Sequence, residues 1–131
     1  METVNVVRVS PDGEVTVHDV PVDSWRDMVR VLGGYMELVH LDESLTTAFP
    51  GIVAYVDEEA LHKTPRPAVN PYGLSLLIQD YPYILGNLLI STNSVYDPED
   101  NEYGEDYIEP GTTISMSPGA VLEIKRRINQ E

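Results

Sequence analysis

The chain has 131 residues and a mass of 14.6 kDa, which is the usual size of a single domain. It carries 22 Asp and Glu against eight Lys and Arg, so its formal net charge is −14 at pH 7, and it contains no cysteine. This charge disfavours direct binding of a nucleic-acid backbone, and the lack of cysteine excludes disulfides, thiolate metal sites and cysteine nucleophiles. A basic partner protein, a cation or another small ligand is compatible with the composition.

The apolar stretches of the chain are short. The longest lie near residues 74–78 and 84–90 and fall far short of a membrane span, and the first residues lack the basic and apolar regions of a secretory signal. We therefore expect a cytoplasmic protein that has no membrane partner. No motif requires a cofactor, and the composition leaves a homo-oligomer open.

The first part of the chain predicts a hairpin and a helix. Two runs rich in Val, at about 3–9 and 14–20, flank a Ser-Pro-Asp-Gly turn, as the strands of a β-hairpin do. A helix is predicted over 23–32, where apolar residues repeat at helical spacing ahead of two glycines: Trp25, Met28, Val29 and Leu32. This spacing predicts that Trp25 belongs to the core.

Two strands are predicted next, over 35–41 and 51–57, with a turn between them. The first carries apolar residues on both faces, which is typical of a central strand that is covered on two sides. Glu37 is the exception in this strand, and an acid among apolar neighbours needs a partner. If the two strands pair as an antiparallel hairpin, Asp57 leaves the sheet near Tyr35.

The second half of the chain predicts fewer regular elements. Pro65, Pro67 and Pro71 oppose a long helix or a central strand in 58–73. Patterns beyond them predict a short helix over 72–80, strands over 85–92 and 112–116, and a final helix over 118–129 with Ser117 as its N-cap. Seven acids between residues 97 and 109 predict an exposed acidic loop at about 93–111.

Together these elements predict an α+β fold in one domain over residues 1–131. Its sheet would be antiparallel or mixed, with about five strands, and the predicted helices are those over 23–32, 72–80 and 118–129.

Four short motifs occur along the chain, at 33–39 (GGYMELV), 56–61 (VDEEAL), 70–71 (NP) and 86–90 (GNLLI). In this order they resemble the pattern of a family of small uncharacterised proteins of bacteriophages, plasmids and bacteria. The family pattern has a glycine pair before a strand with Tyr and Glu, then V-D-E-E-G-L, an Asn-Pro loop and a G-x-x-L-hydrophobic strand. The chain departs from the pattern at Ala60, where Gly is usual, and in its acidic segment, which resembles an insertion. The resemblance implies a phage or mobile-element setting, where small acidic proteins often counter host defences, and it carries no catalytic activity.

Carboxylates and histidines provide the first candidate site. Glu37 and Asp57, close together across paired strands, would suit a divalent cation or acid–base chemistry. Alternatively, Asp57 caps the turn that follows it. His40 and His62 with Asp57 would form a metal site of two histidines and one carboxylate, although their spacing does not demand it and structural histidines are the simpler interpretation.

Tyrosines and asparagines provide the second candidate site. The chain has eight Tyr but one Phe and one Trp, and tyrosine both stacks on flat ligands and donates a hydrogen bond. The alternative is that these rings serve the core or an interface. No nucleophile or phosphate-loop motif occurs, so no catalytic residue and no metal ligand is assigned. The predicted ligand-binding residues are Tyr35, Glu37, Asp57, Asn70, Tyr72 and Asn87.

Three functional hypotheses follow from these features. The first is a non-enzymatic, phage-type binding protein that sequesters a small, nucleotide-like ligand or blocks a host defence protein. The second is an acidic DNA mimic that inhibits a nucleic-acid-binding enzyme. The third is a small metal-dependent hydrolase that uses Glu37, Asp57 and His62.

Overall fold

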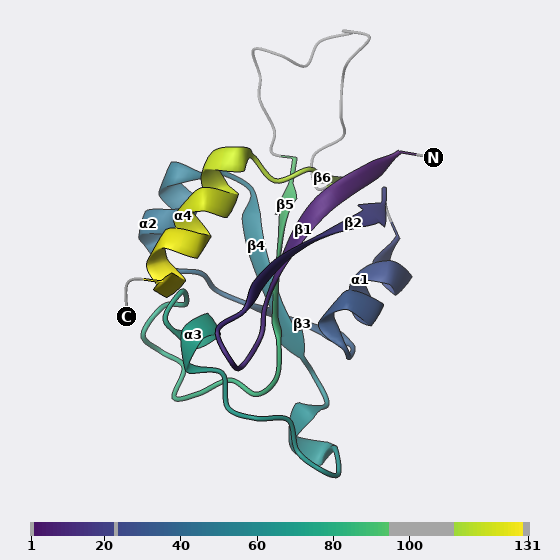
Figure 1. Cartoon of the computed structure of the whole chain (residues 1–131), viewed down its shortest axis with the longest axis vertical. Coiled ribbons are helices and arrows are strands. Elements are labelled where there is room, and N and C mark those ends of the chain that lie inside the picture. The colour runs from purple at the N-terminus through teal and green to yellow at the C-terminus, as the bar shows by residue number, and fades with distance from the viewer. Residues whose placement is uncertain (1, 23, 95–111, 130–131) are drawn as a thin grey trace, which may run out of the picture.

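The computed structural model describes residues 2–22, 24–94 and 112–129. Within these ranges the chain forms one antiparallel sheet of six strands with helices on both faces, which confirms the predicted α+β class (Figure 1). The strands are β1 (Thr3–Val9), β2 (Val15–Pro21), β3 (Met36–Val39), β4 (Ile52–Asp57), β5 (Leu88–Asn93) and β6 (Thr113–Ile114). The helices are α1 (Trp25–Leu32), α2 (Glu43–Ala48), the 3-10 turn η1 (Ala60–His62), α3 (Pro71–Leu74) and α4 (Pro118–Asn129).

The sheet has the strand order β2-β1-β5-β4-β3, and the short β6 pairs with β5. The predicted hairpin is confirmed, because β1 and β2 pair in register from Thr3 with Pro21 to Val9 with Val15. Gly13 has the positive φ of 88° that its turn requires. Strand β5 lies between β1 and β4 and therefore joins the N-terminal hairpin to the β3–β4 pair.

Each face of the sheet is covered by its own apolar cluster. On one face, side chains of β1, β4 and β5 pack against α2 and α4, through Leu45, Ile124 and Ile128. On the other face, Met28 and Leu32 of α1 pack against β1 and β5. Figure 1 shows α2 and α4 together on one side of the strands and α1 on the other. Burial of these side chains is the main force that holds the layers together.

Helix α1 forms where predicted, but Trp25 does not lie in the core. Met28, Val31 and Leu32 pack against the sheet, whereas Trp25 is 55% exposed. Trp25 projects at nearly the same angle as Leu32, seven residues later, but it is the first residue of α1 and lies at the end of the buried stripe. The prediction of a core Trp25 is therefore wrong, because helical periodicity gives the side of the helix that is buried and not how far along the helix the sheet covers it.

The segment after α1 differs from the prediction in two ways. Strand β3 pairs only with β4 among the described strands, so it is an edge strand and not a central one. The connection from β3 to β4 contains helix α2, where a turn was predicted. The apolar residues on the two faces of 35–41 have different environments. Leu41 lies beyond the strand and enters the core with Leu45, whereas Leu38 lies in the strand and is 54% exposed.

The segment between β4 and β5 is mostly irregular. The helix predicted over 72–80 is wrong in its extent, since α3 ends at Leu74. Beyond it the backbone turns towards β3: the Ile78 N–H donates to the His40 carbonyl at 3.0 Å, and the Asp42 N–H donates to the Leu76 carbonyl at 2.8 Å. These tertiary hydrogen bonds satisfy backbone groups that a longer helix would have paired internally.

The C-terminal helix is confirmed over its full predicted length. The Ser117 hydroxyl accepts a hydrogen bond from the Ala120 N–H at 3.1 Å, as expected for an N-cap. Of the predicted acidic loop at about 93–111, Asn93 belongs to β5 and the Ser94 N–H donates to the Thr112 carbonyl at 2.8 Å. Residues 95–111 lie outside the described residues.

Candidate functional site

Asp57 closes the end of the β3–β4 pair. The register places it opposite Met36, near Tyr35 as predicted, and it is 8% exposed. Its carboxylate accepts a hydrogen bond from the Glu59 N–H at 3.0 Å and forms an ion pair with Lys63. Asp57 therefore caps the turn that leads into η1, in agreement with the structural alternative considered for it.

Glu37 points away from Asp57. Glu37 lies opposite Val56, so its side chain shares the face of Val56, and the next residue of β4 points to the other face. The two carboxylates therefore do not converge on a shared cation. Among the described residues, no group of three or more His, Asp and Glu is placed to hold a metal ion.

The three histidines belong to different elements, since His18 lies in β2, His40 follows β3 and His62 ends η1. His40 and His62 are both exposed. His18 is hydrogen-bonded to Thr16 at 2.8 Å, and burial, followed by the positive charge of Arg8, lowers its pKa below the usual value. This geometry does not support the hydrolase that was predicted from Glu37, Asp57 and His62.

The two asparagines serve the backbone. Asn70 is fully buried, and its amide donates to the carbonyls of Val9 at 2.9 Å and Gly86 at 2.8 Å. Its side-chain oxygen accepts from the Gly73 N–H at 2.8 Å, so Asn70 also caps α3. Asn87 donates to the carbonyl of Leu32 at 3.0 Å. These contacts favour a structural role for both residues over contact with a ligand.

The two tyrosines of the predicted site lie apart. Tyr72 is half-buried against the core, and its ring packs over the hairpin turn at Gly13, where a Cβ would come within 3.1 Å of it. Tyr35 is 55% exposed, and its carbonyl accepts from the Glu58 N–H at 2.8 Å. Of the predicted residues, Tyr35, Glu37 and Asp57 are thus gathered at the β3–β4 end, whereas Asn70 and Tyr72 lie over the β1–β2 turn.

A cavity of about 160 Å³ opens beside Glu37. We call it the Tyr81–Tyr83 cavity, after the two aromatic residues that line it. Apolar side chains of the sheet and of the segment before β5 also line it, among them Val39, Val56, Leu61, Ile84 and Leu85, together with the acids Glu37, Asp57 and Glu58. The cavity therefore combines an apolar, aromatic lining with the negative charge of Glu37 and Glu58, because the Asp57 carboxylate is paired with Lys63.

A second hollow, of about 400 Å³, adjoins this cavity and shares Leu61, Tyr83 and Leu85 with it. Arg66 and Val69 also line it. Leu61, Val69 and Tyr83 are each about half exposed, at 50%, 53% and 48%. Large apolar side chains gathered in this way are a feature of binding surfaces.

The sequence analysis found only part of this site. Glu37 and Asp57 were among the predicted ligand-binding residues, whereas Tyr81, Tyr83, Glu58 and Leu61 were not assigned to the site. The Tyr81-Pro82-Tyr83 sequence weakly predicts that the two rings lie on the same face, because alternate residues of an extended segment share one face. Nothing local in the sequence indicates that this segment packs beside the end of β4.

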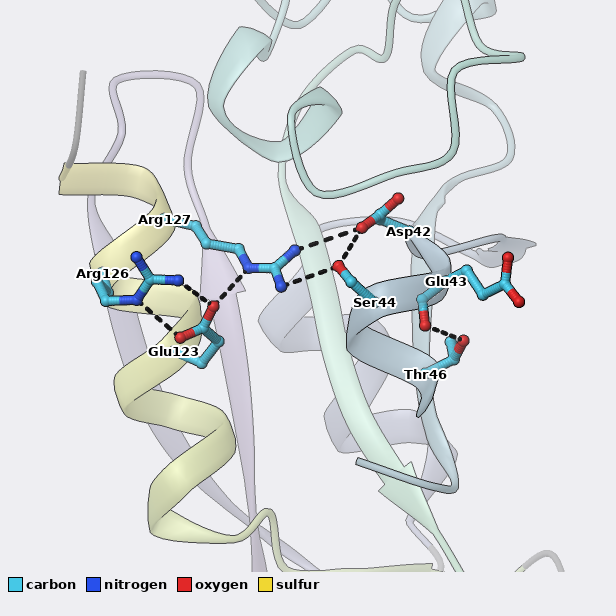
Figure 2. Close-up of polar contacts among 7 residues, drawn as sticks. All are labelled: Asp42, Glu43, Ser44, Thr46, Glu123, Arg126 and Arg127. Atoms are coloured by element: carbon cyan, nitrogen blue, oxygen red, sulfur yellow. Dashed lines mark hydrogen bonds and ion pairs between the residues drawn. The ribbon is translucent and has the colours of Figure 1, made fainter. Parts of the chain in front are cut away.

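A different polar cluster joins the end of α4 to the start of α2 (Figure 2). Glu123 accepts hydrogen bonds from Arg126 at 2.5 and 2.8 Å and from Arg127 at 2.7 Å. Arg127 also reaches the Ser44 hydroxyl at 2.9 Å and the Asp42 carboxylate at 3.5 Å. Since each charged group in the cluster has a partner within it, we assign the cluster to the fold and not to a ligand.

Hydrogen bonds from Arg126 and then Arg127 lower the pKa of Glu123 from its usual 4.5 to about 2. A carboxylate with a depressed folded-state pKa adds stability above its unfolded pKa and loses it as the pH falls through its folded pKa. We therefore expect Glu123→Gln to be less stable than the parent at pH 7, and we expect this difference to shrink between pH 4.5 and about 2. Urea unfolding at several pH values measures it.

The matched control is Glu43→Gln, which removes an exposed carboxylate that has no ion pair among the described residues. Its effect should change much less over the same pH interval. If the difference in unfolding free energy between Glu123→Gln and the parent stays constant from pH 7 down to about pH 2, the arginine pairs do not stabilise the Glu123 carboxylate.

Comparisons of the chain with protein-family models, with curated proteins and with solved structures found no match. The resemblance to the phage and plasmid family therefore stays a prediction. Within the part of the chain that the structure describes, no helix is both long and apolar enough to cross a membrane.

Proposed function

We propose that this chain is a non-enzymatic binding protein that takes a cationic group of its partner into the Tyr81–Tyr83 cavity. The observation that carries the proposal is the pairing of two tyrosines with the acids Glu37 and Glu58 around one apolar cavity. Neither of these carboxylates has a side-chain ion pair or hydrogen bond among the described residues, so both are available to a ligand.

A cation suits this lining for two reasons. Carboxylates beside apolar surface attract a cation more strongly than carboxylates in open solvent, because the local dielectric constant is lower. The faces of tyrosine rings add an attraction of about 0.5–2 kcal/mol for an ammonium or guanidinium group. Lys63 does not neutralise the cavity, since it is paired with Asp57 and donates to the Gly33 carbonyl at 2.7 Å.

The cavity fits a side chain better than it fits a nucleotide. Its volume of about 160 Å³ is below the roughly 300–1,000 Å³ that is typical of sites for larger organic ligands. The acids at the cavity and the net charge of −14 would repel a phosphate. Of the predicted partners, the geometry therefore supports a basic host protein more than a nucleotide-like ligand. The alternative function, an inhibitor that imitates DNA, would also have a basic protein as its partner.

The test is a titration of isotopically labelled protein with n-butylammonium and n-butylguanidinium chloride, followed by amide NMR shifts. We expect saturable shifts around Glu37, Glu58 and Tyr83, and we expect Glu37→Gln and Tyr83→Ala to reduce them while the rest of the spectrum stays folded. Glu14→Gln, which removes an exposed acid of the hairpin turn, is the matched control. Equal losses in Glu14→Gln and Glu37→Gln, or equal binding of butyrate, would overturn the proposal.

A further inference from the structure

The outer edge of β3 is partly covered and partly open. Its C-terminal end is covered, because the His40 N–H donates to the Tyr81 hydroxyl at 3.0 Å and the Ile78 N–H donates to the His40 carbonyl. Leu41 then forms an isolated bridge with Leu77. The open part is the stretch before His40, next to the Tyr81–Tyr83 cavity.

The register determines which backbone groups face outward. The Glu58 N–H donates to the Tyr35 carbonyl, so Tyr35 and Glu37 direct their backbone groups towards β4. Met36 and Leu38 direct theirs away from β4. Among the described residues, the N–H and C=O groups of Met36 and Leu38 have no partner on that side.

Of the features that usually protect edge strands, β3 has a short length and the charge of Glu37, but it lacks lysine, proline and a bulge. Leu38 is 54% exposed and Tyr35 is 55% exposed. Glu37 is the charged side chain of the strand, and it lies on the face of the cavity. The edge thus presents the unpaired backbone groups of Met36 and Leu38, with the apolar Leu38 side chain on one face of the strand and the acidic Glu37 side chain on the other.

We propose that an extended segment of a basic partner protein pairs with β3 as a further antiparallel strand. This inference rests on the proposed function and specifies its partner. Successive side chains of an added strand point to opposite faces of the sheet. One basic side chain would therefore enter the cavity, and the residues before and after it would lie against Met36 and Leu38. The partner sequence is therefore apolar–basic–apolar.

The register places the basic residue favourably. Glu37 directs its own backbone groups to β4, so the residue opposite it on the added strand forms a non-hydrogen-bonded pair. Side chains in such pairs lie closer together than those in hydrogen-bonded pairs, and opposite charges there are stabilising. The residues opposite Met36 and Leu38 supply the main-chain hydrogen bonds.

Charge complementarity favours a basic partner over a second copy of this chain. Glu37 lies on β3 itself, Glu58 lines the same cavity, and both are exposed. Antiparallel pairing of two β3 edges would bring two copies of these acids together, and each copy has a net charge of −14. Like charges at this spacing are destabilising.

The experiment uses the capped peptide Thr-Val-Lys-Val-Thr and two N-methylated forms. In the proposed register the two valine N–H groups point to β3 and the lysine N–H points away. We expect methylation of both valine nitrogens to weaken binding by about tenfold or more, and methylation of the lysine nitrogen to change it much less, by isothermal titration calorimetry. On the protein side, Leu38→Pro should weaken binding more than Leu38→Ala, since the proline removes an outward N–H group.

The outcomes separate this inference from the proposed function. If both methylated peptides bind like the parent peptide while butylammonium still requires Glu37, strand pairing is wrong and the cation site remains. If butylammonium binding does not depend on Glu37, the proposed function itself fails. If sedimentation shows a dimer of the chain alone that Leu38→Pro dissociates, a second copy occupies the edge and the inference is overturned.

Discussion

Asn70→Ala is expected to lower the free energy of unfolding by about 3–5 kcal/mol. The substitution leaves the carbonyls of Val9 and Gly86 and the N–H of Gly73 without their partner, in a site where Asn70 is fully buried. Each buried group that loses its hydrogen bond costs about 1–3 kcal/mol, and incomplete relaxation around the smaller side chain adds to this. Urea unfolding followed by circular dichroism measures the change.

The control for this prediction is Asn87→Ala. The Asn87 amide makes one hydrogen bond, to Leu32, and the side chain is half-exposed, so the loss should be about 1 kcal/mol. Similar unfolding midpoints for the two variants would show that the buried network around Asn70 is not a main support of the fold.

Gly34→Ala is expected to destabilise the protein by about 2–4 kcal/mol, through overpacking and the displacement of the buried Asp57 carboxylate from its partners. A Cβ on Gly34 would overlap the carboxyl group of Asp57. Asp57 would have to leave its contacts with Lys63 and the Glu59 N–H, which are the contacts that close the β3–β4 end. Thermal unfolding and amide exchange at residues 57–63 report this change.

Gly119→Ala is the matched control, because Gly119 lies in the first turn of α4 and a Cβ there would be 3.7 Å from the Phe49 ring, an ordinary contact. It should stabilise the protein by about 0.4–1 kcal/mol, since alanine restricts the unfolded chain more than glycine does. Neutral behaviour of Gly34→Ala beside a stabilising Gly119→Ala would mean that Asp57 is free to move.

The helices and strands that neighbouring residues encode were predicted correctly from the sequence. The β1–β2 hairpin depends on alternating Val residues and a Ser-Pro-Asp-Gly turn, and α4 depends on the Ser117 cap and a regular apolar stripe. In both cases neighbours in the sequence provide most of the information. Residues 72–80 were predicted as a helix because short apolar runs are ambiguous. Helix α2 was predicted as a turn because its six residues are mostly polar and only Leu45 is buried, so they carry no repeating apolar stripe.

The candidate site depends on contacts between distant segments. Asp57 and Tyr35 were placed together correctly because a strand pair fixes their distance. Asn70 was assigned to a ligand, yet its partners Val9 and Gly86 come from other segments that the sequence could not place beside it. The pairing of Tyr81 and Tyr83 with Glu37 has the same origin, since it requires the irregular segment before β5 to fold back along the sheet.

The central position of β5 has a consequence for the order of folding. The N-terminal hairpin and the β3–β4 pair each have one strand edge that only β5 covers in the described sheet. During synthesis both edges stay open until residue 93 has left the ribosome, because β5 ends there. Closure then requires contacts across long sequence separations, which slow folding and lengthen the exposure of unpaired strands. Nascent chains truncated before residue 88 should therefore aggregate or recruit chaperones more than chains that contain both β5 and α4, since α4 also covers one face of the sheet.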